Sequence, residues 1–188
     1  MKCKLLVAVI TVLSLATLGL TQNAAQNAAQ DRDQPSAKSQ ERITKDVRHQ
    51  LLMLPYLGVF DNIAFKVDGY TVILVGQVAR PSLKPDAENV VKRIEGVEKV
   101  DNQIEVLPTS PSDDRLRHRL YNAIYRYAPL QKYALGVQKP IRIIVKNGNV
   151  TLEGVVDNEG DKTFAGMRAN GVSGIFSVTN NLRVESSK

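Results

Sequence analysis

An eleven-residue segment near the middle of the chain recurs near its C-terminus. The first copy runs from Gly96 to Val106 and the second from Gly174 to Val184, and both read Gly-apolar-x-x-Val-x-Asn-x-apolar-x-Val. Gly76 and Gly154 recur at the same spacing as the two segments. Two features that repeat at one spacing indicate one structural unit used twice. The repeat therefore predicts two small domains in tandem.

The hydrophobic pattern of the first unit predicts a helix, two strands, a second helix and a third strand. Ile43, Val47 and Leu51 recur every four residues, as on one face of a helix that ends before Pro55. Two β-branched runs then flank Asp68-Gly69, which is the signal of a β-hairpin. Helical spacing over residues 82–94 and the repeated Gly-to-Val segment complete the unit.

The second unit shows the same order, with a stronger hairpin signal at Asn147-Gly148. Its second helix is expected to be weaker because Gly166 lies inside it. Its loop at 129–140 is longer than that of the first unit, which makes this loop a place to look for function. The predicted fold class is α+β, two tandem αββαβ units. The predicted domains are residues 41–107 and 113–185, joined by a linker at 108–112.

The N-terminal segment, residues 1–40, is unlike the rest of the chain. Residues 1–21 have a basic start at Lys2 and Lys4 and an apolar run from Leu5 to Leu20, which predicts a secretory signal peptide. The run is short for a membrane span, so a cleaved signal is favoured over a retained anchor. Residues 22–40 are rich in Gln, Asn, Ala and Ser and are predicted to be a disordered spacer. The expected localisation is periplasmic or secreted.

The residues of the chain suggest no catalytic or metal site. The only cysteine is Cys3, inside the predicted signal, so the mature chain is expected to lack thiols and disulfides. His49 and His118 have no second histidine or cysteine nearby, and solvated helix positions explain them better than catalysis. Asp113 and Asp114 are interpreted as capping a helix N-terminus. The prediction is therefore a protein that is not an enzyme, with no cofactor and no metal.

Each unit resembles a BON domain, the family named after bacterial OsmY and nodulation proteins. The resemblance rests on the hairpins with their glycines and on the repeated Gly-apolar-x-x-Val-x-Asn motif. It implies a small three-stranded mixed sheet packed against two helices on one face. It also implies a cell-envelope protein linked to osmotic stress and envelope integrity, with phospholipid or another envelope component as ligand. The family transfers no catalytic residues, and the matching positions are interpreted as structural: Gly76, Gly96, Asn102, Gly154, Gly174 and Asn180.

The candidate binding surface is the first helix of the second unit. Arg115, Arg119, Asn122 and Arg126 form one polar stripe opposite the apolar face, and Arg117, Tyr121 and Tyr125 form a second stripe beside it. Arginine binds phosphate in a bidentate manner and tyrosine favours the headgroup boundary of a membrane. An ordinary solvated helix face is the alternative interpretation. The lipid-binding candidates are Arg115, Arg117, Arg119, Tyr121, Tyr125, Arg126, Lys132 and Tyr133.

Charge and secretion limit the choice of partner. The net charge is +6 and falls to +4 without Lys2 and Lys4, a mild bias toward anionic partners. Together with secretion, this modest charge argues against a nucleic-acid partner. The leading hypothesis is an envelope protein that binds an anionic phospholipid membrane surface or an envelope protein. The alternative is a stress-response protein-interaction module without lipid contact, and the oligomeric state is left open.

Overall fold

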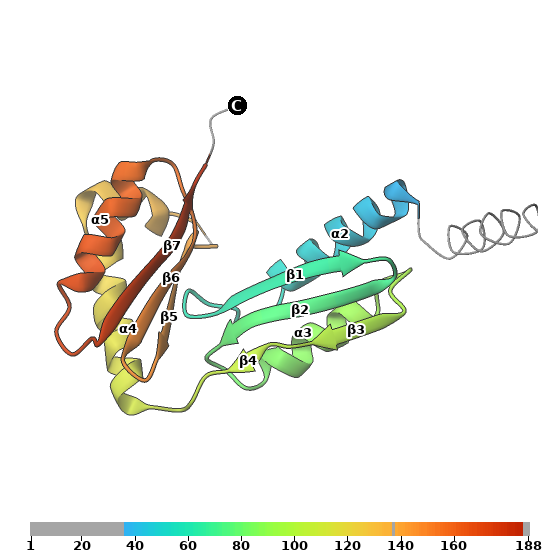
Figure 1. Cartoon of the computed structure of the whole chain (residues 1–188), viewed down its shortest axis with the longest axis horizontal. Helices are drawn as coiled ribbons and strands as arrows, with labels where there is room; N and C mark the ends of the chain where they lie inside the picture. The colour runs from blue at the N-terminus through green and yellow to red at the C-terminus, as the bar shows by residue number, and fades with distance from the viewer. Residues whose placement is uncertain (1–35, 137, 186–188) are drawn as a thin grey trace, which may run out of the picture.

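The structure, a computed structural model, describes residues 36–136 and 138–185. The predicted signal peptide and most of the predicted spacer lie outside these residues. The described chain forms two αββαβ units side by side (Figure 1), which confirms the predicted α+β class. The elements of the first unit are α2 (Ala37–Leu52), β1 (Asn62–Asp68), β2 (Thr71–Val78), α3 (Leu83–Lys92), β3 (Lys99–Asn102) and β4 (Glu105–Val106).

The second unit repeats this order with one addition, a 3₁₀ helix in the loop that the sequence showed to be enlarged. In both units the hairpin is antiparallel and the last strand pairs parallel with the second, so the middle strand of each sheet is β2 or β6. The elements are α4 (Pro111–Tyr125), η1 (Ala128–Ala134), β5 (Ile141–Lys146), β6 (Asn149–Val156), α5 (Glu159–Asn170) and β7 (Ser177–Val184).

Both first helices begin earlier than the sequence pattern indicates, because serine caps precede them. The Ser36 hydroxyl accepts a hydrogen bond from Ser39 N at 3.3 Å, so residues 37–40 of the predicted spacer are helical. The Ser110 hydroxyl accepts one from Asp113 N at 3.2 Å, with Pro111 in the first turn, so the predicted linker is partly helical too. The periodicity of apolar residues marks only the buried part of each helix.

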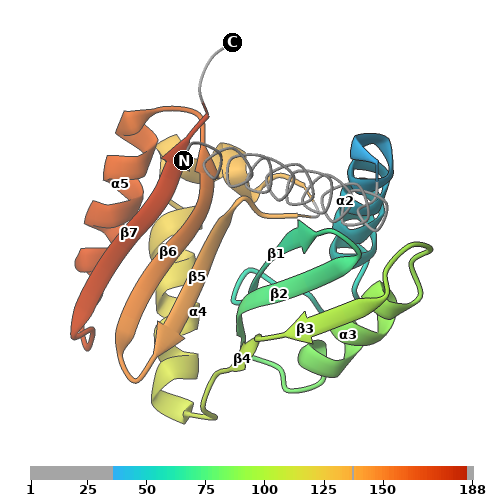
Figure 2. The same ribbon diagram turned by 45° about the vertical axis from the view of Figure 1, so that its right-hand side comes forward.

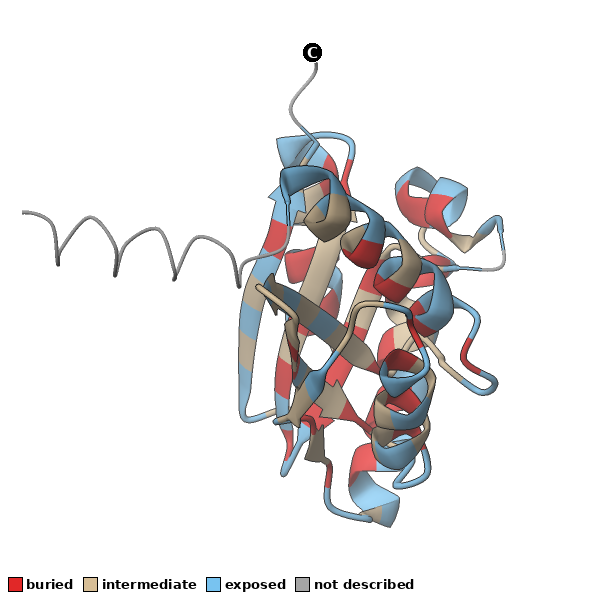
Figure 3. Cartoon of the chain, turned by 90° about the vertical axis from the view of Figure 1, so that its right-hand side faces the viewer, coloured by how far each residue is buried: buried red, intermediate tan, exposed pale blue. Residues whose placement is uncertain are grey.

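Each unit has its own hydrophobic core between its helices and its sheet. Buried residues recur along the helices and strands in Figure 3. In the first unit, Ile43 and Val47 of α2 pack with Val72 and Leu74 of β2. In the second, the corresponding layer includes Leu116, Leu120 and Ile124 of α4 and Ile143 and Leu152 of the hairpin. The apolar residues that recur in the sequence of each unit therefore pack mainly against one another within that unit.

The repeated asparagines make the same contacts in both units. Asn102 Nδ2 donates to the Lys84 carbonyl at 2.8 Å, and Asn180 Nδ2 donates to the Lys162 carbonyl at 2.8 Å. Each Oδ1 accepts from the amide two residues ahead, at 3.2 and 3.3 Å. The asparagine therefore ties the last strand to the second helix of its unit. In the first unit the strand is interrupted after Asn102, so the single predicted strand is divided into β3 and β4.

The segment before β1 joins the two units. Val59 O accepts a hydrogen bond from Ile143 N at 2.8 Å, and Gly58 O accepts one from Arg142 Nη1 at 2.7 Å. Phe60 packs against the core of the second unit, with its ring 5.9 Å from that of His118. Figure 2 shows this loop beside β5. Since β5 is the edge strand of its sheet, the loop supplies backbone partners that the edge would otherwise lack.

A second set of contacts lies at the other end of the junction. Lys146 Nζ of β5 forms an ion pair with Glu105 Oε1 of β4 at 2.5 Å. Leu107 and Ile144 are both buried, belong to neither unit's core and line one common groove. They are therefore buried where the two units meet. Both polar and apolar contacts thus hold the second sheet against the first unit.

Candidate functional site

The first predicted stripe of α4 lies on the surface. Arg115, Arg119, Asn122 and Arg126 are all exposed, while Leu116, Leu120 and Ile124 on the opposite face are buried. Arg115 Nη2 donates to Ser112 Oγ at 3.1 Å and Arg119 Nη1 to Ser173 Oγ at 3.3 Å. Within the part of the chain that the structure describes, no carboxylate forms an ion pair with these three arginines. Their charges are available to an external anion.

The prediction of a second, solvent-facing stripe is wrong for two of its three residues. Arg117 is only 4% exposed: it pairs with Asp114 at 2.5 Å and donates from Nη2 to the Val145 carbonyl at 2.8 Å. Tyr125 is 3% exposed and its hydroxyl donates to the Ile141 carbonyl at 2.6 Å. Burial raises the pKa of the Tyr125 hydroxyl well above its ordinary value. Both side chains fix α4 to β5 and cannot reach a membrane.

The aromatic rings of α4 instead form part of the junction between the units. Tyr121 is half-buried, and its ring lies 4.9 Å from that of Tyr125 and 6.5 Å from that of Phe60. Aromatic pairs at such separations stabilise packing beyond the area that they bury. The 55–61 loop contributes the apolar residues Leu57, Val59 and Phe60. This loop was not among the predicted sites, although apolar side chains clustered in a loop are a signal that could have indicated a docking segment.

The two candidates in the 129–140 loop have structural partners. Tyr133 is buried, and its hydroxyl donates to Asp161 Oδ2 and accepts from Asp157 N, each at 2.7 Å. Lys132 is exposed but pairs with Asp157 at 2.5 Å and Asp161 at 2.7 Å. The hydrogen bonds from Lys132 to Asp157 and to Asp161 raise the pKa of this lysine. The prediction that Tyr133 contacts lipid is therefore wrong. The charge of Lys132 is already neutralised by two carboxylates within the chain.

Asp113 has a different role from the predicted helix cap. Its buried carboxylate accepts hydrogen bonds from Asn147 N at 2.8 Å and Gly148 N at 2.9 Å, in the turn between β5 and β6. Ser110 caps the helix instead. An acidic residue in the first turn still interacts well with the helix dipole. Asp113 thus fastens the hairpin turn of the second unit to the start of α4.

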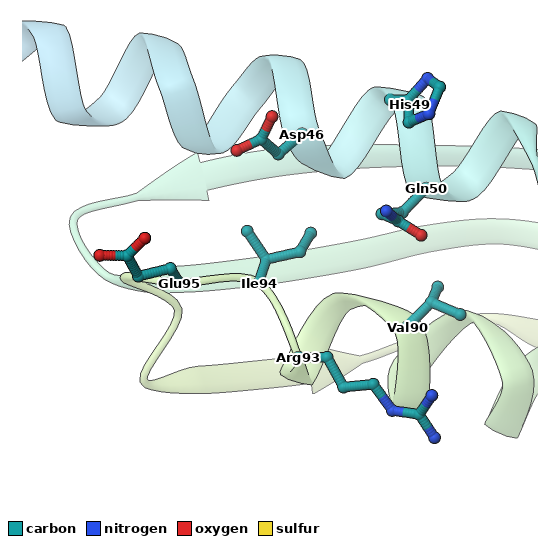
Figure 4. A pocket seen from close by; sticks show the side chains of 7 residues that line it. All are labelled: Asp46, His49, Gln50, Val90, Arg93, Ile94 and Glu95. Carbon is teal, nitrogen blue, oxygen red and sulfur yellow. The ribbon is translucent and has the colours of Figure 1, made fainter.

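A pocket of about 300 Å³ lies between α2 and α3 of the first unit (Figure 4). Asp46, His49 and Gln50 line it from α2, and Arg93 from the end of α3. In Figure 4 His49 points away from α3, so the polar groups do not converge on one point. In residues 36–136 and 138–185, no group of three or more His, Cys, Asp or Glu side chains is arranged to hold a metal ion.

The corresponding position in the second unit carries a long, charged side chain. At the spacing of the repeat, Arg168 takes the place of Val90, which lines the pocket of the first unit. Its Nε donates to the Ala123 carbonyl at 3.1 Å, and its guanidinium lies 5.1 Å from the centre of the Tyr127 ring. Arg168 thus links α5 to α4 by a hydrogen bond and a cation-π contact. The two units therefore share a fold but differ in the side chain at this position between their helices.

The geometry is that of two small domains with an exposed basic helix, and a family comparison identifies them. The BON domain family matches the chain twice, at residues 39–108 and 113–186, so the chain belongs to the BON domain family. BON domains occur in envelope and stress-related proteins, and the family is in general not catalytic. None of the helices that the structure describes has the length and apolar content to cross a membrane.

Comparison with solved structures gives weaker similarity. One is CdsD, a structural protein of the type III secretion system of Chlamydia trachomatis, at 12% identity, covering 77% of this chain and 94% of that chain with a TM-score of 0.29. The C-terminal domain of CdsD, also at 12% identity, covers 75% and 96% with a TM-score of 0.30. TM-scores this low support no conclusion about function. A search of curated proteins found no match.

Proposed function

We propose that this chain is a non-enzymatic protein of the cell envelope that binds anionic phospholipid through Arg115, Arg119 and Arg126. One observation carries the proposal: the three arginines are exposed along one helix, and no carboxylate pairs with them among the residues that the structure describes. A guanidinium can donate two parallel hydrogen bonds to one phosphate group. The family's occurrence in envelope proteins supports a membrane partner.

The first unit does not share this stripe. Aligning the buried residues Ile43 and Leu116 places Arg42, Asp46 and Met53 of the first unit opposite the three arginines. Arg42 is paired with Glu95 at 2.9 Å. The first helix therefore presents one neutralised cation, one acid and one apolar side chain at these places. The stripe of three exposed arginines is therefore specific to the second unit.

The proposal includes delivery to the envelope. Residues 1–21 would act as a secretory signal, and the mature chain would work in the periplasm or outside the cell, where the family is linked to osmotic and envelope stress. A protein-interaction role without lipid contact is the competing proposal. The two differ in whether the purified chain binds a lipid surface.

Flotation of the purified mature chain with vesicles containing phosphatidylglycerol tests the proposal. Each arginine near an anionic surface contributes on the order of 1 kcal/mol. Replacing Arg115, Arg119 and Arg126 by Gln is therefore expected to weaken binding about 100-fold at low salt. The matched control replaces Lys66, Arg93 and Lys99, three exposed cations of the first unit, by Gln. An equal loss in the control would mean that net charge alone drives binding, and absence of wild-type binding would favour the protein-interaction role.

A further inference from the structure

Four exposed apolar side chains belong to segments that meet where the two units join. Leu52, Met53, Tyr56 and Leu135, which we call the junction patch, are 44%, 69%, 71% and 79% exposed. Leu52 and Met53 end α2, and Tyr56 follows in the next loop. Gln138 Nε2 donates to the Leu52 carbonyl at 3.1 Å, which brings the segment after η1 to the end of α2. Apolar side chains gathered on a surface commonly mark an interaction site.

Tyr56 has a strained backbone without the compensation of burial. Its φ is +67°, in the left-handed region that bulky residues rarely adopt. Such a conformation is energetically unfavourable and is most frequent at functional sites. The surrounding loop thus holds a large aromatic ring out toward solvent. An amphipathic ring in this position suits the boundary between headgroups and acyl chains.

Cations accompany the apolar side chains. The Arg80 guanidinium lies 5.1 Å from the centre of the Tyr56 ring. Arg48 lies one helical turn before Leu52, and both line one small cavity. Lys139 Nζ donates to the carbonyls of Ala134 and Gly136, on either side of Leu135.

Within residues 36–136 and 138–185, none of these three cations forms an ion pair with a carboxylate. The neighbouring acid Asp61 is 3% exposed, and its oxygens accept from the amides of Gly58 and Ala79. Its charge is therefore directed to backbone amides inside the fold. Among the described residues, Arg48, Arg80 and Lys139 thus accompany the patch without a carboxylate paired to any of them.

We propose that the junction patch inserts into the interfacial layer of an anionic bilayer, so that the first unit contacts the membrane as well as the second. This inference rests on the proposed function and adds the apolar half of the contact. The leucine and methionine side chains would enter the acyl boundary, about 5–10 Å deep, while Arg48, Arg80 and Lys139 meet phosphates. A protein partner would need an apolar pocket for each of these side chains and an acidic residue placed opposite each cation. An anionic headgroup layer needs no such match, because it presents negative charge over its whole surface.

The absence of tryptophan from the chain makes a direct test possible. Tyr56→Trp would introduce a single fluorophore into the patch. Val75→Trp is the matched control, because Val75 is 39% exposed on a strand of the same unit. With vesicles containing brominated phosphatidylglycerol, the Tyr56→Trp emission is expected to shift to the blue and to lose at least half its intensity. The control emission is expected to change little.

A second pair of variants tests the energetics. Met53→Asp and Leu135→Asp place a charge on exposed positions, so the fold is retained, and each is expected to weaken vesicle binding about tenfold. If the Tyr56→Trp chain floats with vesicles but its emission is not quenched, the proposed insertion is wrong while the proposed function stands. The junction patch would then be interpreted as a contact site for a protein partner. If the wild-type chain does not float, the proposed function and this inference both fail.

Discussion

The carbonyl oxygen of Pro140 lies over Gly154 so closely that a Cβ on this residue would be only 1.9 Å from it. Gly76 has the same relationship with the Asn62 carbonyl, at 2.0 Å. In both units the start of the first strand pairs with the middle strand at a position where only glycine leaves room for a backbone carbonyl. The φ angles, +127° and +122°, also lie where other residues are strained. Gly76 and Gly154 therefore allow the backbone at the start of the first strand to approach the middle strand closely.

Gly154→Ala is therefore expected to destabilise the protein strongly, by at least about 4 kcal/mol, because the methyl group would overlap a backbone atom that cannot move freely. Urea unfolding followed by circular dichroism measures the effect. Gly136→Ala is the matched control: its φ is +111°, but nothing lies within 4 Å of the added Cβ. The control is expected to cost less, about 1–3 kcal/mol, from the backbone strain alone. Equal losses in the two variants would contradict the steric explanation.

Phe60→Ala is expected to uncouple the two units. The Phe60 ring lies against His118 and Tyr121, and its loss should remove on the order of 1–3 kcal/mol from the junction. Calorimetry of the wild type is expected to show one transition, and the variant two, because each unit has its own core. Phe176→Ala is the control, since that ring is 83% exposed and should change stability by less than about 0.5 kcal/mol. A single unshifted transition in Phe60→Ala would show that the ring does not couple the units.

The sequence predicts the fold well because the fold depends on local patterns that occur twice. Periodic apolar residues such as Ile43 and Leu116 mark the helices, and the Asn-Gly turn at 147–148 marks the second hairpin. The repeat then supports each assignment with a second copy. Gly166 looked unfavourable inside a helix, yet a Cβ there would come within 2.9 Å of Asn180 Nδ2, so the glycine leaves room for the asparagine contact that both units share.

The candidate site was harder to predict because the fate of a polar side chain depends on distant segments. Arg117 neighbours Leu116 on α4, but only β5, 28 residues away, supplies the carbonyl that allows it to be buried. Tyr133 can be buried because the Asp161 carboxylate, again 28 residues away, accepts a hydrogen bond from its hydroxyl. Such pairings have no signature in a single sequence. The exposed positions Arg115, Arg119 and Arg126 were predictable since helical periodicity alone places them opposite the core.

The cluster around Asp161 makes the stability of the second unit depend on pH. Asp161 is 5% exposed in the first turn of α5, and its carboxylate receives hydrogen bonds from Tyr133 Oη at 2.7 Å and Asn158 Nδ2 at 3.0 Å. Lys132 Nζ lies 2.7 Å away. Burial favours the protonated acid, but the hydrogen bonds from Lys132 and Tyr133 together outweigh burial, so the pKa of Asp161 is lowered.

A lowered pKa in the folded state means that the Asp161 carboxylate contributes stability above its unfolded pKa of about 3.9, and that this contribution is lost as the pH falls through the lower folded value. Asp161→Asn cannot titrate. The difference in free energy of unfolding between wild type and this variant is therefore expected to be largest at pH 7 and to shrink below pH 4. Urea unfolding at pH 7, 5, 3 and 2 measures it. In the control, Asp157→Asn, the lost carboxylate is 54% exposed and pairs with the same lysine, so the change should be below about 1 kcal/mol. A difference that stays constant from pH 7 to pH 2 would show that Asp161 acts through its shape and not through its charge.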